Sequence, residues 1–167
     1  LASLALSIVL TFEPHPKEFF STEQAPARIL NLRDKLAALA ELGIDRAVVE
    51  HFNAAFARLS PDEFVSEIIV KHLNTKWILI GDDFHYGAKR AGNFQSLVES
   101  GKQWGFEVER MDTLAEQGLR ISSSATRAAL TSGNLELTRS LLGRPYTISG
   151  HVLHGQKLGR DLGFPTL

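Results

Sequence analysis

Residues 7–12 have the sequence SIVLTF, and this run stops at Glu13-Pro14. A short apolar run rich in β-branched residues and ended by a proline is typical of a buried strand. Comparable runs lie at residues 47–50, 77–80 and 106–110, and a segment with helical signals precedes each of them. Strands separated by helices of this length indicate parallel β-α-β units. The sequence therefore predicts an α/β fold with a doubly wound parallel sheet.

Capping residues predict the helices between these strands. Asn31 begins a helix with an apolar leucine face, and Gly43 ends it. Residues 60–63, Ser-Pro-Asp-Glu, form a capping box with proline at the first helical position, and the helix continues to about Leu73. A third helix runs from the cap Asn93 to Gly105. In sheets of this kind ligands bind beyond the carboxyl ends of the strands, where polar loops follow Phe12, Ile80 and the region of Ile121.

Composition excludes several functions. The 167 residues include 18 basic and 19 acidic side chains, for a net charge of -1, so no overall field attracts nucleic acid or an anionic membrane. The absence of cysteine removes disulfides, thiolate metal sites and cysteine nucleophiles, and agrees with a cytoplasmic protein. The apolar residues 1–10 are too short to cross a bilayer, and we interpret them as part of a strand rather than a targeting segment.

Residues 121–127, ISSSATR, place hydroxyl side chains at the start of a helix that Gly133 ends. The free N–H groups and the positive dipole end of such a helix make an anion site. Arg127, one turn into the helix, can fork onto phosphate oxygens. An ordinary serine cap with a solvated arginine is the alternative, and it is the commoner meaning of an isolated S-x-x-R.

Residues 81–90, GDDFHYGAKR, follow the predicted strand at 77–80. Paired aspartates at a strand end can hold Mg²⁺ or accept hydrogen bonds from a ligand. Phe84 and Tyr86 can form walls around a ligand ring. A polar turn followed by a solvated Lys-Arg pair explains the same residues equally well.

Residues 11–16, TFEPHP, leave the first predicted strand through two prolines, which fix the directions of Glu13 and His15. A rigid loop at this end of a strand suits a ligand wall. A histidine next to prolines is nevertheless more often structural than catalytic, and no second histidine lies at a metal-binding spacing.

The character of the chain changes at residues 143–145, where we place a domain boundary. Residues 146–153 alternate as a half-exposed strand, and no helical period follows. The next segment combines glycines with basic side chains, at Gly155, Lys157, Gly159, Arg160 and Gly163. Such a loop can approach phosphates with its backbone, although a hairpin with a long glycine-rich loop is the simpler alternative.

Taken in order, four segments resemble the bacterial bifunctional riboflavin kinase/FMN adenylyltransferase (FAD synthetase) family: TFEPHP, IGDDFHYGAKRAGNF, RISSSATR and SGHVLHGQKLGRDLGFPT. The resemblance runs from Ser7 to Thr166. It implies a Rossmann-like adenylyltransferase domain of the nucleotidylyl transferase superfamily at residues 1–143. It also implies that residues 146–167 form the first strands of a small β-barrel, the riboflavin kinase domain.

The resemblance also implies roles for single residues. In the family a Ser-Ser-Thr-x-x-Arg motif grips the ATP phosphates, so Ser123, Ser124 and Arg127 are implied to bind ATP, with Arg127 catalytic; Ser124 keeps the hydroxyl of the usual threonine. The implied flavin-binding residues are Pro14, His15, Pro16, Asp83, Phe84 and Tyr86. The implied nucleotide loop of the kinase domain contains Gly155, Lys157, Gly159, Arg160 and Thr166, and Thr166 helps to hold Mg²⁺ with ATP.

Two departures from the family are visible. The motif G-x-F-D-G-x-H-x-G-H, expected before TFEPHP, is absent, and residues 1–6 are too few to hold its strand, loop and helix. The run ending in Pro165-Thr166 should continue to Ala-Asn, but Leu167 follows. We therefore expect the chain to be a fragment whose kinase barrel lies mostly outside it.

The expected reaction is adenylyl transfer from ATP to FMN, giving FAD and pyrophosphate, while the kinase domain phosphorylates riboflavin. The expected small molecules are ATP, FMN, riboflavin and Mg²⁺; no nucleic-acid or membrane partner is expected, and the oligomeric state is open. One alternative is another nucleotidylyltransferase, and a second is a flavin- or nucleotide-binding module without turnover.

Overall fold

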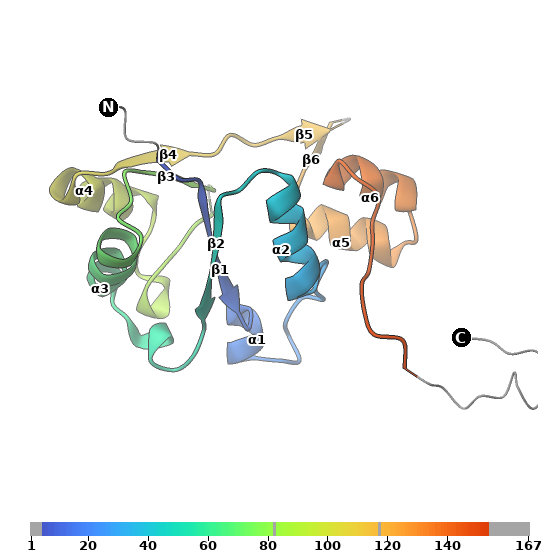
Figure 1. Ribbon diagram of the computed structural model, residues 1–167, viewed down its shortest axis with the longest axis horizontal. Coiled ribbons are helices and arrows are strands. Elements are labelled where there is room, and N and C mark those ends of the chain that lie inside the picture. Colours follow the sequence, from blue (N-terminus) through green and yellow to red (C-terminus); the bar gives the residue numbers. More distant parts are fainter. Residues whose placement is uncertain (1–4, 82, 117, 154–167) are drawn as a thin grey trace, which may run out of the picture.

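The computed structural model describes residues 5–81, 83–116 and 118–153 (Figure 1). Strand β1 (Ile8–Glu13) pairs in parallel with β2 (Arg46–His51), and β3 (Trp77–Ile80) pairs in parallel with β4 (Glu107–Arg110). The α/β class and the parallel pairing are therefore confirmed. Within the described ranges, however, the strands form two separate pairs and not one continuous sheet.

The helices connect these strands in the predicted order. They are α1 (Pro16–Phe20), α2 (Leu32–Glu41), η1 (Phe56–Arg58), α3 (Pro61–Glu63), η2 (Phe64–His72), η3 (Ala88–Arg90), α4 (Phe94–Trp104), α5 (Ser123–Thr131) and α6 (Leu135–Leu142). A short antiparallel hairpin, β5 (Ala115–Glu116) and β6 (Leu119–Arg120), precedes α5.

The predicted caps are present. The Asn31 side chain accepts a hydrogen bond from the N–H of Asp34 at 2.8 Å and begins α2. Ser60 and Glu63 form the predicted capping box at the start of α3. Gly105 ends α4 with φ of 78°, a left-handed conformation that a residue without a Cβ adopts most easily. Local side-chain chemistry thus sets these helix ends.

The core lies where η2 and α4 pack against β3. Leu97 and Ile69 are almost completely buried there. The buried apolar cluster comprises Phe64, Val65, Ile68, Ile69, Ile80, Tyr86, Leu97 and Phe106. Leu10 of β1 is half-buried and packs against this cluster, which ties the β1–β2 pair to the same core. Helix η2 has π-helical winding, which the sequence did not predict.

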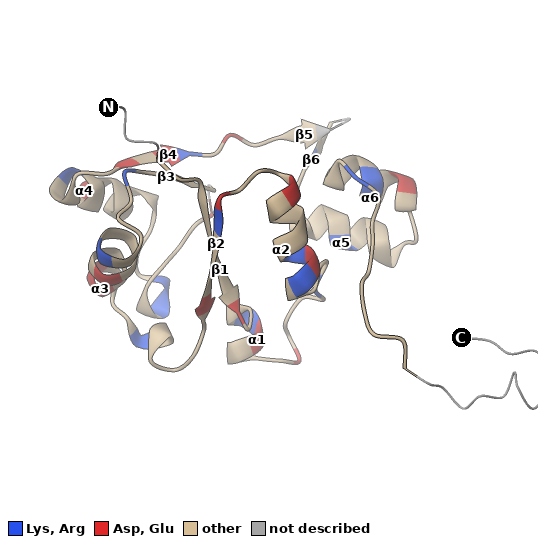
Figure 2. Ribbon diagram, viewed as in Figure 1, with Lys and Arg blue, Asp and Glu red and all other residues tan. Residues whose placement is uncertain are grey.

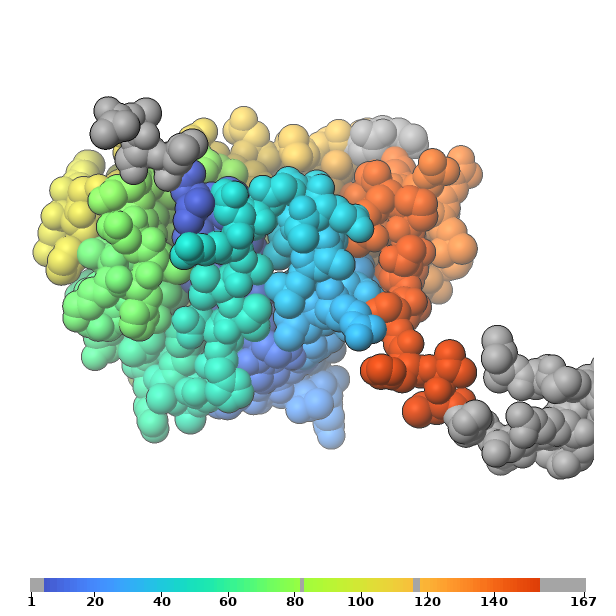
Figure 3. All heavy atoms as spheres, viewed as in Figure 1, coloured from blue at the N-terminus to red at the C-terminus, as the bar shows by residue number. Residues whose placement is uncertain are grey.

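The segment after α6 differs from its prediction. Residues 146–153 were expected to form a strand, but the structure gives them no strand conformation. Instead the segment runs beside α2 (Figures 1 and 3), where the N–H of Ser149 donates to Asp34 at 3.1 Å and its carbonyl accepts from Asn31 at 3.0 Å. Its backbone groups are therefore partly satisfied by helix side chains and not by a neighbouring strand.

Helices α5 and α6 pack together at the side of α2 that faces away from β2 (Figure 1). No helix in the described part of the chain is long and apolar enough to cross a membrane.

Candidate functional site

The loop after β1 turns directly into α1, and His15 caps that helix. Its Nδ1 accepts a hydrogen bond from the N–H of Lys17 at 3.1 Å, and the Glu18 carboxylate accepts from the N–H of His15 at 3.2 Å. The peptide bond between Glu13 and Pro14 is cis. The histidine therefore has a structural role, as the commoner interpretation of its sequence context suggested. Its side chain is still exposed beside the strand end.

Arg28 locks this loop in place. Its guanidinium donates to Glu13 at 2.6 and 3.1 Å, in the two-pronged geometry that guanidinium and carboxylate groups favour. It also donates to Glu18, through Nε at 2.6 Å and through Nη2. Hydrogen bonds from Arg28 lower the pKa of Glu18 to about 2, and the two carboxylates raise the pKa of Arg28. Sequence reasoning missed Arg28, because nothing in the spacing of these residues shows that they meet.

Helix α5 presents the predicted hydroxyl cluster. Ser122 is the cap, and its Oγ accepts from the N–H of Ala125 at 3.2 Å. Ser123 and Ser124 follow in the first turn and are exposed. Their position next to the free N–H groups at the helix start is the arrangement required for an anion site.

Arg127 brings α5 against the loop that Arg28 holds. Its Nε donates to the carbonyl of Ala27 at 2.6 Å, across 100 residues of sequence. The ISSSATR segment thus contacts the loop between α1 and α2, and Arg28 of that loop binds Glu13 of the TFEPHP segment. Lys and Arg residues occur on α1, α2 and α5 (Figure 2).

Positive charges from several of these segments act on His15. Partial burial lowers the pKa of His15, Glu18 opposes that shift, and the positive charges of Lys17, Arg127 and Lys35 lower the pKa further. Lys35 comes from α2, and its Nζ donates to Thr11 Oγ1 at 3.1 Å. Three elements therefore direct positive charge toward the carboxyl end of β1.

The loop after β3 carries the second group of predicted residues. Asp83 is exposed, and Phe84 is half-buried and stacks on Tyr86, with ring centroids 5.6 Å apart and an angle of 23° between the rings. Tyr86 is only 6% exposed and packs in the core against Phe64. A Cβ at Gly92 would lie 2.6 Å from the Tyr86 ring, so only glycine fits beside it. In this arrangement Phe84 is the ring that can reach a ligand, and Tyr86 supports it.

Other predicted residues lie elsewhere. Gly155, Lys157, Gly159, Arg160 and Thr166 are outside the described residues, as is Asp82. Within residues 5–81, 83–116 and 118–153, no hydrogen bond or ion pair joins the 83–90 loop to α5.

A hollow of about 630 Å³ lies at the amino ends of β3 and β4 and is lined by residues such as Lys76 and Glu107. It is therefore at the opposite end of these strands from the candidate site.

Parallel strands joined by helices define an α/β protein, and the start of α5 with nearby basic residues gives it a candidate anion site near the carboxyl end of β1. Comparison with known protein families shows which family of α/β proteins the chain belongs to. The FAD synthetase family model matches residues 2–125, which is most of the chain, and the riboflavin kinase family model matches residues 142–167. The chain belongs to the FAD synthetase family.

Curated relatives agree with this family. The chain is 48% identical over 159 residues to the bifunctional riboflavin kinase/FMN adenylyltransferase of Escherichia coli, covering 95% of this chain and 51% of that protein. It is 46% identical over 158 residues to the protein of the same name from Haemophilus influenzae, with the same two coverages. The chain thus spans about half the length of the curated relatives it matches.

A solved structure shares the fold. It is a crystal structure described as a macrolide-efflux protein from Streptococcus pneumoniae, with a TM-score of 0.70 and 28% sequence identity, and the match covers 95% of this chain and 51% of that one. Similarity over nearly the whole chain supports the arrangement of elements described above.

Proposed function

We propose that the protein transfers the adenylyl group of ATP to FMN, giving FAD and pyrophosphate, as part of a bifunctional enzyme that also phosphorylates riboflavin. The family match and the names of the relatives support this activity. The observation that carries it is the hydrogen bond from Arg127 of α5 to Ala27 in the loop between α1 and α2, because the next residue, Arg28, binds Glu13 at the end of β1. An anion site and a candidate flavin wall then share one edge of the molecule.

In the proposed reaction an oxygen of the FMN phosphate attacks the α-phosphorus of ATP. A new P–O bond forms, the bond between the α-phosphorus and the bridging oxygen breaks, and its electron pair leaves with pyrophosphate. Such a transfer depends on positioning and on neutralising charge. Ser123, Ser124 and the free N–H groups of α5 would bind the phosphates, and Arg127 would stabilise the charge that develops on the leaving pyrophosphate.

The flavin would bind against the TFEPHP loop and the loop after β3. In this proposal Asp83 accepts a hydrogen bond from a ring N–H, and Phe84, supported by Tyr86, contacts the ring face. Pro14, His15 and Pro16 would form the facing wall, because Arg28 and the α1 cap hold them rigidly. Rigid loops at the carboxyl ends of strands are suited to this task.

The proposal includes two domains and a cytoplasmic location. Residues 1–143 would form the adenylyltransferase domain and residues 146–167 the beginning of a β-barrel riboflavin kinase domain, which the separate family matches support. The nucleotide loop of that domain would contain Gly155, Lys157, Gly159, Arg160 and Thr166.

In this proposal Mg²⁺ binds as part of its complex with ATP. Among the described side chains, no group of three or more His, Cys, Asp or Glu converges to hold a metal ion. The described residues therefore do not fit a metal bound by the protein alone, and the proposed adenylyl transfer does not depend on one. Thr166 would contact the ion together with ATP in the kinase domain.

The test is product formation by the full-length gene product given ATP and FMN. We expect FAD and pyrophosphate to appear in equal amounts, and FMN to appear when riboflavin replaces FMN. FAD absent from a folded protein that still binds FMN would favour a binding module. Transfer of the adenylyl group to an acceptor other than FMN would favour another nucleotidylyltransferase.

A further inference from the structure

Lys35 lies beside the candidate phosphate site, and the proposed reaction assigns it no role. It lies in the second turn of α2, is half-buried, and donates through Nζ to Thr11 Oγ1 at 3.1 Å near the carboxyl end of β1. Within the described ranges it makes no ion pair. Holding a lysine ammonium partly out of water without a carboxylate partner costs free energy, and an anionic ligand bound beside it would offset that cost.

The nearby carboxylates do not balance this charge. Glu13 and Glu18, the two acidic residues of the β1–α1 segment, are both bound by Arg28. Asp34, the neighbour of Lys35 in sequence, accepts hydrogen bonds from Ser149. The acidic groups around the TFEPHP loop therefore already have partners, and those partners are not Lys35.

Arg127 approaches the same place from α5. Lys35 and Arg127 both act electrostatically on His15, and Arg127 is held by the carbonyl of Ala27, one residue before Arg28. Thr11 fixes the direction of the Lys35 ammonium, in the same way that Ala27 fixes Arg127. Two cations from two helices thus both act on His15, just beyond the end of β1, and such a pair is suited to an anion with several oxygens.

We propose that Lys35 is a second phosphate-binding residue of the site, acting with Arg127 on a phosphate group held above the carboxyl end of β1. This inference rests on the proposed adenylyl transfer and deepens it. Lysine suits the role as a compact charge, whereas Arg127 supplies the two-pronged contact. The phosphate belongs either to FMN or to the β- and γ-phosphates of ATP, and both present the same chemistry to Lys35.

The test compares Lys35→Met and Lys35→Arg with the wild-type full-length gene product, and uses Lys102→Met on α4 as a matched control away from the site. Two quantities are measured: the KM for FMN and for ATP, and the rise in melting temperature caused by inorganic pyrophosphate. Circular dichroism confirms that each variant folds.

We expect Lys35→Met to raise one KM by about 10–100-fold, the scale of one hydrogen bond to a charged group. Lys35→Arg should recover part of this loss, and Lys102→Met should behave as wild type. A change in the KM for FMN alone assigns the flavin phosphate; a change in the KM for ATP, with a smaller stabilisation by pyrophosphate, assigns the ATP phosphates.

Wild-type KM values and full stabilisation by pyrophosphate in a folded Lys35→Met variant would overturn the inference. If the wild type makes no FAD, the proposed function fails. The effect of Lys35→Met on stabilisation by pyrophosphate then decides the inference separately.

Discussion

The side chains around β1 divide into a group that builds the site and a group that is available to a ligand. The guanidinium of Arg28 donates hydrogen bonds to Glu13 and Glu18 and so holds the TFEPHP loop. Few of its N–H groups remain for a phosphate. Among the described residues, Lys35 and Arg127 donate hydrogen bonds only to a hydroxyl and a carbonyl, both neutral acceptors. Their charges therefore remain effective toward an incoming anion.

Sequence reasoning found the second group only in part. Ser123, Ser124 and Arg127 could be predicted because a helix start has a local signature of hydroxyl residues. Lys35 and Arg28 have no local signature, since their significance arises from contacts with strand and loop residues that are remote in sequence. From sequence, His15 could have either a structural role or a role in binding a ligand. The structure shows that it caps α1.

Low pH should weaken the interaction between Arg28 and Glu18. The pKa of Glu18 is lowered from 4.5 to about 2 in the folded protein, mainly by hydrogen bonds from Arg28. A carboxylate with a lowered folded pKa adds stability above its unfolded pKa and loses that contribution as the pH falls toward the folded pKa. We therefore expect Glu18→Gln to lower the melting temperature at pH 7, and the difference from wild type to shrink between about pH 4.5 and pH 2.

Glu67→Gln is the control for this titration, because Glu67 forms an exposed ion pair with Lys71 on the surface of η2, and such pairs contribute little. Its melting temperature should stay close to wild type at every pH. A Glu18→Gln difference that stays constant from pH 7 to pH 2 would show that the carboxylate charge does not stabilise the loop.

At the level of elements, predictions succeeded where the signal was local. The capped helices α2, α3 and α4 and the four principal strands lie where caps, glycines and apolar runs placed them. Helix α1 was missed, because the Pro-His-Pro sequence was interpreted only as a rigid loop. The expected strand at 146–153 was not confirmed, because alternation predicts a strand only when a partner edge is available, and Ser149 binds α2 instead.

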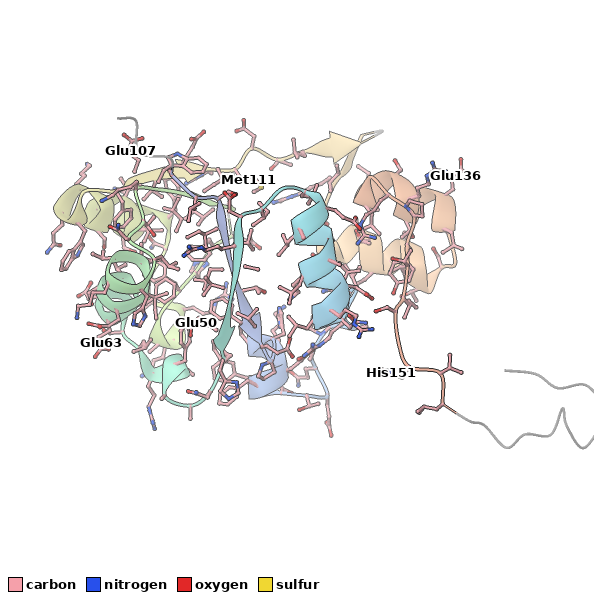
Figure 4. All side chains as sticks on the ribbon, in the orientation of Figure 1. Glu50, Glu63, Glu107, Met111, Glu136 and His151 are labelled. Atoms are coloured by element: carbon pink, nitrogen blue, oxygen red, sulfur yellow. The ribbon has the colours of Figure 1, made fainter. Side chains whose placement is uncertain are left out.

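The contact between Ser149 and α2 has a measurable consequence. Asp34 accepts from both the N–H and the hydroxyl of Ser149, and Asn31 donates to its carbonyl. The chain between α6 and His151 passes beside α2 (Figure 4). We expect Asp34→Ala to release this segment and to increase chymotryptic cleavage at Tyr146 and Leu153 several-fold, because segments with few contacts open at little cost.

Glu41→Ala, at the far end of the same helix, is the matched control and should leave the cleavage rate unchanged. Cleavage of Asp34→Ala at the wild-type rate, with α2 intact by circular dichroism, would show that the contact does not order the segment.

On the scale of the molecule, the core and the candidate phosphate site are assembled from different parts. The buried cluster joins β3, η2 and α4, whereas the phosphate site draws on β1, α2 and α5. The loop after β3 connects them, because Tyr86 is part of the cluster and Phe84 packs against it. The parallel arrangement was predictable because β-α-β connections restrict topology. The division into two strand pairs was not, because local patterns do not specify which edges pair.

The proposed boundary at residues 143–145 predicts that the activities are separable. All candidate adenylyl-transfer residues lie before Gly143, which ends α6 in a left-handed conformation with φ of 67°. We expect the full-length gene product truncated after Gly143 to retain most FAD synthesis from FMN and to lose riboflavin phosphorylation. Both rates are measured after circular dichroism confirms folding, and a folded truncation unable to make FAD would contradict the boundary or the site.

The most direct test of the site is Arg127→Ala in the full-length gene product, with both rates measured on one preparation. Pyrophosphate gains charge as it leaves, so Arg127 should stabilise the transition state more than bound ATP. We predict that FAD synthesis falls by about 10²–10³-fold, the range for losing one well-placed charge-stabilising donor, while riboflavin phosphorylation is nearly unchanged. Equal loss of both activities would mean that Arg127 only holds Ala27 and the fold, and no loss of either would contradict the site.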